Sequence, residues 1–213
     1  RVVVPRLYIA KSKRDSRASG LLAKNIHLEA ESFDNKGSSV VGETVVLHAR
    51  SGDINNTGGG DIYASKHLGL EAARDINNVG STVESGGTGS IHAGRHIKNT
   101  TESRRIGSDE NHFTSIGKEA TMKTKEQTVL TSGGDVVNTG SIEVGGLTFA
   151  IGGDFINESI EDSESTEMLF KDGHYKRQSV VHKPATFTSS GSTKGVVAGN
   201  FGMIGSRMSS AGD

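Results

Sequence analysis

Two closely similar stretches, SGDINNTGGG at Ser51–Gly60 and AARDINNVGS at Ala72–Ser81, decide the fold. Both contain the phrase DINN, and their second asparagines, Asn56 and Asn78, lie 22 residues apart. A catalytic motif needs to occur only once, whereas a phrase that returns at a fixed interval is typical of a repeated structural unit. The chain is therefore expected to be built from repeats.

The asparagine that marks the repeat recurs along most of the chain, at intervals of 21, 22, 21, 39 and 19 residues. The marker positions are Asn35, Asn56, Asn78, Asn99, Asn138 and Asn157. A glycine follows two positions later at Gly37, Gly58, Gly80 and Gly140. The pattern lapses at Thr101 and Ser159, and the interval of 39 residues equals either about two periods or one period with an insertion.

Short segments in which apolar and other residues alternate accompany the marker, as in IHLEA from Ile26, VVLHA from Val45 and LGLEA from Leu68. Segments of this kind, bounded by Gly, Asn, Asp or Ser, are typical of β-strands. Three short strands in a period of about 20 residues bury their apolar face only by stacking on neighbouring periods. The sequence predicts an all-β fold, a parallel β-helix with coils of about 19–22 residues; a β-sandwich or barrel is the alternative.

Residues one period apart should stack directly in such a fold. The inward rows should contain Ile26, Val45 and Leu68 in one case and Ile54, Ile76, Val136 and Phe155 in another, whereas His27, Glu29, Glu71 and Glu143 should point outward. The marker asparagine should occupy a corner, because Asn tolerates left-handed backbone angles and its amide can bond to the asparagines above and below. The glycine that follows permits a positive φ.

Two segments interrupt the rhythm, and both are more charged than the repeats. We therefore expect an irregular lead-in at 1–20, repeats at 21–100, an insertion at 101–130 that includes a candidate β-arm, repeats at 131–158, a charged insertion at 159–193, and resumed, truncated repeats at 194–213. Insertions in repeat proteins leave the scaffold as loops on one face. They are either partner-binding elements or solvated decoration.

Composition excludes several classes of function. The 24 basic and 25 acidic residues nearly cancel, so no broad basic field favours nucleic acid as a partner. The chain has no cysteine and no apolar run long enough to span a bilayer as a helix. It opens on Arg1 without a signal peptide, and we expect a segment of a longer protein, whose exposed strand edges would favour edge-to-edge self-association.

No catalytic, metal or cofactor site emerges from the residue pattern. Four acidic residues, Asp53, Asp75, Asp135 and Asp154, recur at one repeat position. They could act on a glycosidic bond in a carbohydrate-active β-helix enzyme, but no second set of carboxylates accompanies them, and turn capping explains them better. His92 and His96 have the spacing of a helical metal pair but lie in a strand repeat. We therefore predict that the protein is not an enzyme.

The phrases GSIHAGRHIKN from Gly89, LGLEAARDINNVGS from Leu68 and GGDVVNTGSIEVGG from Gly133 resemble the haemagglutinin repeats of filamentous haemagglutinin-like exoproteins. VPRLYIA from Val4, followed by LLAKNIHLEAESFDNKGS from Leu21, resembles the start of the second haemagglutinin-repeat region. Two-partner secretion systems of Gram-negative bacteria export this family, which includes filamentous adhesins and contact-dependent growth inhibition proteins.

The resemblance implies a right-handed β-helix within a long fibre on the outside of the bacterial outer membrane. It implies two partners: the outer-membrane transporter during secretion and the surface of a target cell, bacterial or host. The expected function is a filament segment for contact-dependent toxin delivery to neighbouring bacteria, and the alternative is a segment of a host-cell adhesin. The resemblance carries no catalytic motif or cofactor into the repeats, and it gives the insertions no role.

Overall fold

The computed structural model describes residues 19–171 and 173–211, so nearly all of the predicted lead-in at 1–20 lies outside the described residues. The described residues form 22 strands and no helix, which confirms the prediction of an all-β fold. None of them supplies a helix that could cross a membrane.

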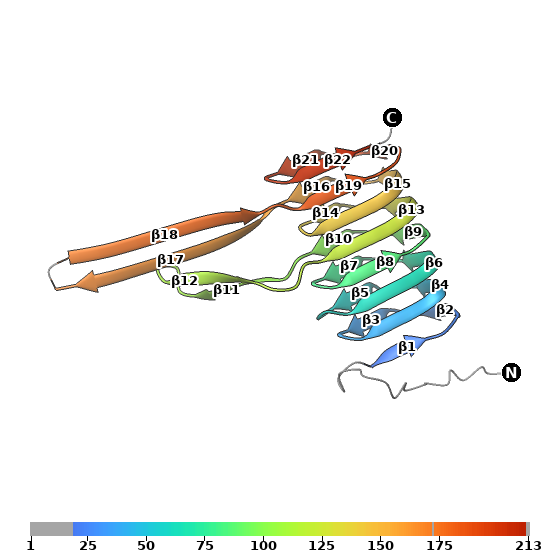
Figure 1. The fold of residues 1–213 in the computed structure, drawn as a ribbon, viewed down its shortest axis with the longest axis horizontal. Helices are drawn as coiled ribbons and strands as arrows, with labels where there is room; N and C mark the ends of the chain where they lie inside the picture. The colour runs from blue at the N-terminus through green and yellow to red at the C-terminus, as the bar shows by residue number, and fades with distance from the viewer. Residues whose placement is uncertain (1–18, 172, 212–213) are drawn as a thin grey trace.

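Two of the three sheets are parallel (Figure 1). The larger contains β1 (Gly20–Leu22), β2 (Asn25–Ala30), β4 (Ser39–Ala49), β6 (Asp61–Ala72), β8 (Thr82–Ser85), β9 (Thr88–Ala93), β13 (Thr121–Ser132), β15 (Ser141–Ile151), β19 (Thr186–Ser189), β20 (Thr193–Val197) and β22 (Arg207–Ser210). The smaller contains β3 (Phe33–Lys36), β5 (Ile54–Thr57), β7 (Ile76–Val79), β10 (Ile97–Thr100), β14 (Val136–Asn138), β16 (Phe155–Glu158) and β21 (Phe201–Ile204).

The chain alternates between these two sheets, and we call one passage through both a coil. Each coil returns one strand position further along the stack, as the strand orders β4-β6-β8 and β3-β5-β7 show. Figure 1 shows the coils lying above one another from β1 to β22. The pairing within both sheets is parallel, unlike the antiparallel pairing of a β-sandwich.

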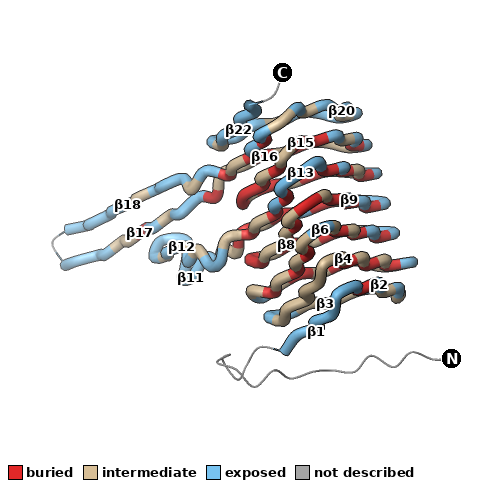
Figure 2. Tube along the Cα trace, turned by 45° about the vertical axis from the view of Figure 1, so that its right-hand side comes forward, coloured by how far each residue is buried: buried red, intermediate tan, exposed pale blue. Residues whose placement is uncertain are grey.

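The register between coils places equivalent apolar residues in rows. Val45 pairs with Ile26 on one side and Leu68 on the other. Ile76 pairs in the same way with Ile54 and Ile97. All six side chains are buried, and Figure 2 shows that the buried positions lie in the stack and recur along the strands of its inner coils. Burying a side chain of this size contributes about 1.5–3 kcal/mol, so the rows inside the stack are the main source of stability.

The predicted rows are confirmed, including the continuation of the second row through Val136 and Phe155. Outward-facing His27, Glu29 and Glu71 are exposed, and Glu143 is half-buried. At one end of the row the ring of Phe155 stacks on Phe201 with centroids 4.9 Å apart. It also meets Phe187 edge to face at 5.7 Å.

Both insertions are shorter than the sequence predicts. The first is predicted to reach residue 130, but Thr121–Ser132 is β13, a long strand of the larger parallel sheet that pairs with β15. We call the two parallel sheets together the wall of the stack. The second was expected to reach residue 193, but Thr186–Ser189 is the wall strand β19. The charge of the first segment does not mark an insertion, because Lys123 and Lys125 point outward from β13 while Met122 and Thr124 are buried. Ala120 and Ala185 are buried where the chain re-enters the wall.

The residues that do leave the wall form the third sheet, which is antiparallel and which we call the arm. It contains β11 (Ser103–Gly107), β12 (His112–Ile116), β17 (Ile160–Phe170) and β18 (Gly173–Lys183), in the order β11-β12-β17-β18. Figure 1 shows the arm projecting sideways from the stack. The fold is therefore a stack of coils that carries one lateral projection.

Candidate functional site

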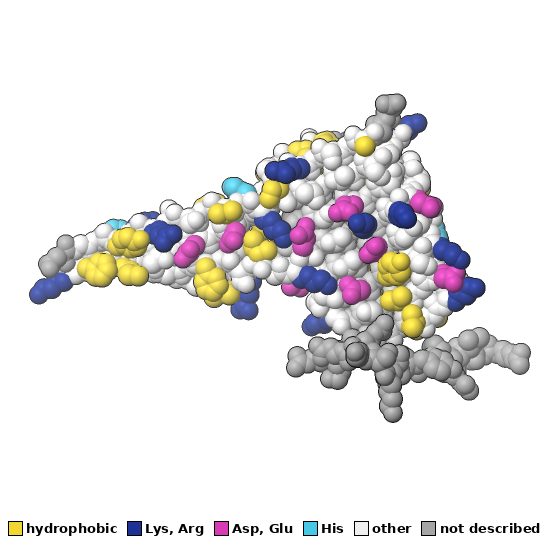
Figure 3. Space-filling view, in the orientation of Figure 1, with side chains coloured by type: hydrophobic (Ala, Val, Ile, Leu, Met, Phe, Trp, Pro, Cys, Tyr) yellow, Lys and Arg dark blue, Asp and Glu magenta, His cyan; other side chains and the backbone are white. Residues whose placement is uncertain are grey.

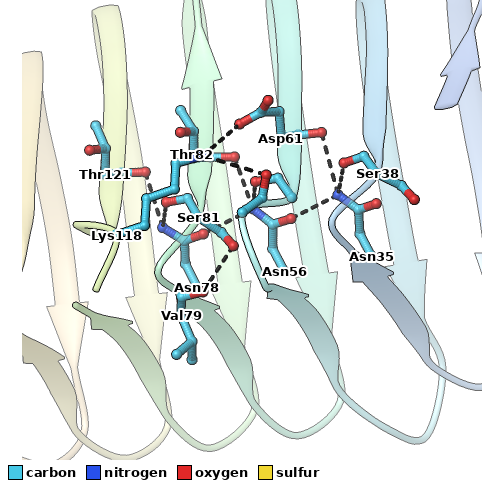
Figure 4. A network of polar contacts seen from close by, with 12 residues as sticks. Asn35, Ser38, Asn56, Asp61, Asn78, Val79, Ser81, Thr82, Lys118 and Thr121 are labelled. Carbon is cyan, nitrogen blue, oxygen red and sulfur yellow. Dashed lines mark hydrogen bonds and ion pairs between the residues drawn. The ribbon is translucent and has the colours of Figure 1, made fainter. Parts of the chain in front are cut away.

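The six marker asparagines lie in strands of the smaller sheet, beside the turn to the larger sheet rather than in the turn itself. They form a continuous row that we call the inner row, and Figure 4 shows Asn35, Asn56 and Asn78. The side-chain amide nitrogen of each of the first five donates a hydrogen bond to the carboxamide oxygen of the next asparagine, and that of Asn157 donates to the backbone oxygen of Arg207. The donor–acceptor distances, from Asn35 to Asn157, are 2.8, 2.9, 2.8, 2.8 and 2.7 Å. Asn78 also donates to the backbone oxygens of Ser81 and Thr121, so each asparagine joins its own corner to the neighbouring coil.

A second polar row, which sequence reasoning missed, runs beside the first on the outer side. Asn77 donates to Asn55 over 2.9 Å, and Asn55 donates to Asp34 over 2.8 Å. These side chains are exposed or half-buried, whereas Asn56 and Asn78 are buried. The signal was present in the sequence, because both copies of DINN contain two adjacent asparagines. Strand alternation sends one inward and the other outward.

Three of the four predicted turn glycines have a positive φ: 60° at Gly37, 61° at Gly58 and 53° at Gly80. The fourth, Gly140, has no positive φ, so the prediction for it is corrected. A glycine is needed at this position because there is no room for a side chain. A Cβ there would lie well under 3.0 Å from the Ala120 carbonyl oxygen. The glycine after the marker asparagine is therefore required for two different reasons, a positive φ in three coils and a lack of space for a Cβ in the fourth.

Replacing Gly58 by alanine should lower the free energy of unfolding by about 1–2 kcal/mol, the usual cost of a left-handed conformation in an L-residue. The nearest atom to the new Cβ, Cγ of Lys36, would be at an ordinary 3.4 Å, so the loss isolates the backbone effect. Gly202→Ala is the control, because Gly202 has no positive φ and no atom within 3.7 Å of such a Cβ. Urea denaturation measures both, and equal midpoints would contradict the assignment.

The four repeated aspartates form a row at a different corner, where each accepts a hydrogen bond from a backbone N–H of the adjacent coil. Oδ1 of Asp53 accepts the N–H of Asp75, and Oδ1 of Asp75 accepts the N–H of His96. Oδ1 of Asp135 accepts the N–H of Asp154 over 2.8 Å. His96 takes the aspartate position in its coil, and its Nδ1 accepts the N–H of Asp135, which places the ring proton of the neutral form on Nε2. No metal-binding group of three or more acidic or histidine side chains occurs within residues 19–171 and 173–211.

One exposed ion pair on the wall shifts a pKa. The pKa of Lys123 lies above its ordinary value because the Glu143 carboxylate, 2.8 Å from its Nζ, accepts its hydrogen bond and attracts its charge. A raised lysine pKa adds stability that is complete below the ordinary value and is lost only as pH rises through the folded-state pKa. Because the pair is exposed, it contributes about 1 kcal/mol at most.

The arm consists of two hairpins, β11–β12 and β17–β18. Both leave the stack at the same kind of corner, directly after the inner row. The first follows β10 and the second follows β16, with β14 between them in the sheet. Other coils close this corner with a tight turn such as Val79–Ser81, where Ser81 donates to the Val79 carbonyl. The hairpins therefore replace a turn and leave the wall register undisturbed.

The two hairpins meet edge to edge. His112 pairs with Ser165 and Phe113 pairs with Glu164. Side chains reinforce this junction: the Glu167 N–H donates to Oδ1 of Asn111 over 2.8 Å. At the base, Nζ of Lys183 lies 3.0 Å from a Glu119 carboxylate oxygen. The arm is thus one four-stranded sheet anchored to the stack.

The arm is where exposed apolar side chains concentrate (Figure 3). Leu169 is 82% exposed and Phe170 is 61% exposed. Together with Met168 and Tyr175, which are also exposed, they form what we call the tip. Since side chains alternate along a strand, Leu169 lies on one face and Met168, Phe170 and Tyr175 lie on the other. Exposed apolar groups of this density mark interaction surfaces.

Comparison with known proteins gives relatives that share one name. Toxin CdiA of Escherichia coli is 29% identical over 171 residues, which cover 76% of this chain and 5% of that protein. The 16S rRNA endonuclease CdiA of Enterobacter cloacae subsp. cloacae is 27% identical over 145 residues, or 66% of this chain and 4% of that protein. The tRNA nuclease CdiA of Escherichia coli is 30% identical over 83 residues, or 38% of this chain and 3% of that protein. No family model and no solved structure matches the chain.

The chain is therefore similar to a region of contact-dependent inhibition toxins, and it spans 5% or less of the length of these relatives. The prediction that the protein is not an enzyme is contradicted, because two of the relatives are nucleases by name. The absence of a catalytic motif from these 213 residues is no guide to the activity of such a protein, because they correspond to a small part of it.

Proposed function

We propose that the two parallel sheets are walls of a right-handed β-helix and that this helix is a filament segment of a secreted, cell-surface exoprotein of the two-partner type. The observation that carries the proposal is the inner row, which repeats one corner in six coils at 19- to 39-residue spacing. A corner that repeats in this way lets a solenoid lengthen without changing its cross-section. The similarity to CdiA toxins supports a role in contact-dependent toxin delivery to neighbouring bacteria.

The whole protein acts, in this proposal, as a toxin on the bacterial surface, with a nuclease activity of the kind named in two relatives. Its partners are the outer-membrane transporter during secretion and the surface of the target cell. The present segment contributes the rigid stack and the arm. The arm is the contact element, because its apolar tip lies at the far end of the projection from the stack (Figure 3).

Binding of the purified, fluorescently labelled chain to bacterial cells tests this function. Replacing residues 159–184 by a single glycine removes the second hairpin and rebuilds the corner as Asn157-Glu158-Gly-Ala185-Thr186. This matches the tight turn of the coil at Asn78, because Thr186 occupies the wall position of Thr82. We expect the intact chain to bind saturably and the shortened chain to lose at least 90% of the bound signal, as expected when anchoring side chains are removed.

A point variant distinguishes the tip from the rest of the hairpin. The double substitution of Leu169 and Phe170 by serine should abolish binding as the deletion does, since both side chains are exposed and neither supports the stack. Val129→Ser is the matched control, because Val129 is 44% exposed but lies on the wall. Undiminished binding by the shortened chain would refute the role of the arm. Binding to epithelial cells instead of bacteria would favour the host-cell adhesin.

A further inference from the structure

Strand β18 forms an outer edge of the arm, and within the described residues no strand pairs with its free side. It pairs with β17 along all 11 of its residues, from Lys183 opposite Ile160 to Gly173 opposite Phe170, without a register shift. A long, regular and unpaired edge presents free backbone N–H and C=O groups to another chain. The other outer strand, β11, has only 5 residues and ends at Gly107, whose φ is 115°.

The β18 edge lacks most of the features that protect natural edges from pairing. It contains no proline and no bulge. Its exposed residues include Tyr175, Val180 and Val181, which are 48, 53 and 60% exposed. Aromatic and β-branched residues favour paired strands and gain from a neighbour that covers them. The edge is therefore suited to receive a further strand.

The charges on the arm indicate which strand would fit. β18 contains Lys176, Arg177 and Lys183 and no acidic residue, whereas β17 carries four acidic residues, Glu161, Asp162, Glu164 and Glu167. The carboxylates of β17 attract basic side chains of β18. The Glu167 carboxylate lies 2.8 Å from Nε2 of His174 and 3.8 Å from Nζ of Lys176. Arg177 has no ion pair with any described residue. A second β18 would be repelled, and an acidic strand would be attracted.

The arm already contains one junction of this kind. The points where its two hairpins leave the stack are two coils apart, which is about two strand spacings of 4.7–4.9 Å each. Each hairpin is two strands wide, so its width is about the same as that separation. The edges of the hairpins therefore meet, and β12 hydrogen-bonds to the acidic strand β17. Adding a strand to an open edge is thus the way in which this sheet is assembled.

We propose that the free edge of β18 binds an extended, acidic peptide segment of a partner protein by strand addition. Phe170 and Gly173 pair across two intervening residues, so they and every second pair after them are hydrogen-bonded to each other. The outward backbone groups are then those of His174, Lys176, Gln178, Val180 and His182. The partner pairs with these groups and places carboxylates beside Lys176 and Arg177. The proposal rests on the arm alone and is independent of the proposed function.

A synthetic peptide with the sequence SIEDSESTE, that of residues 159–167, is the probe, and fluorescence anisotropy with the full chain measures its binding. We expect saturable binding that weakens with salt, at least tenfold weaker binding of a peptide in which every acidic residue is lysine, and slower hydrogen exchange at the outward amides of β18. Gln178→Pro removes an outward N–H, which an edge strand tolerates, and should weaken binding at least tenfold. Gln178→Thr keeps the N–H and should bind as the parent chain does.

Arg177→Glu provides a test that leaves the backbone edge intact, and it should reduce the preference for the acidic peptide at least tenfold, because it places a carboxylate where a cation faced the peptide. Equal binding of the two peptides by the parent chain, or unchanged binding by Gln178→Pro, would overturn the proposal. So would the absence of saturable binding. A dimer of the parent chain in sedimentation analysis that Gln178→Pro dissociates would also overturn it, because the edge would then serve a second copy.

Discussion

Replacing Asn78 by leucine should lower the free energy of unfolding by about 3 kcal/mol, because several buried polar groups lose their partners at once. Asn78 is fully buried and donates hydrogen bonds to the Ser81 and Thr121 carbonyls and to Oδ1 of Asn99. Leucine has a similar volume but no donor, so these acceptors remain buried and unpaired. Urea denaturation followed by far-ultraviolet circular dichroism measures the loss.

The neighbouring asparagine supplies a matched control for this substitution. Asn77 is also an asparagine and lies in the same strand, but it is half-buried, and among the described residues its side-chain amide donates only to Asn55. Water can replace that partner, so Asn77→Leu should change the free energy of unfolding by no more than about 0.5 kcal/mol. Equal losses at the two positions would show that the inner row has no special role in stability.

The sequence predicts the wall because local and long-range requirements coincide there. The residues of Ile76–Val79 alternate between inward and outward positions, and the inward isoleucine and asparagine face the same residue types in the adjacent coils. The period of the repeat therefore predicts the strand, the corner that follows it and the register between coils. The inner row could be placed for the same reason, since a buried amide must find a partner and another asparagine lies directly above it.

The arm could be located by its charge but not delimited or assembled from the sequence. Lys123 and Lys125 suggest an insertion, yet they are the outward residues of a wall strand whose inward residues include Met122 and Thr124. The junction of the two hairpins joins His112 to Ser165, which belong to different repeats and share no pattern. This pairing depends on where the two hairpins leave the stack, and no residue pattern within either hairpin predicts it.

The same scaffold predicts that Leu68→Ala should lower the free energy of unfolding by about 3–4 kcal/mol, toward the upper part of the range for such changes. Leu68 is fully buried in the row between Val45 and Gly89. Gly89 offers no side chain to fill the space, and β6 is hydrogen-bonded to strands on both sides. The coil therefore cannot collapse into the cavity, and the loss exceeds that of the transferred methyl groups alone.

Leu169→Ala is the matched control, since it removes the same atoms from a side chain that is 82% exposed at the tip. Its free energy of unfolding should match that of the parent chain within about 0.5 kcal/mol, the usual range for surface changes. Urea denaturation compares the two variants directly. A small loss for Leu68→Ala would mean that neighbouring coils close over the cavity, and the stack would then be far more compliant than two-sided pairing of every inner strand implies.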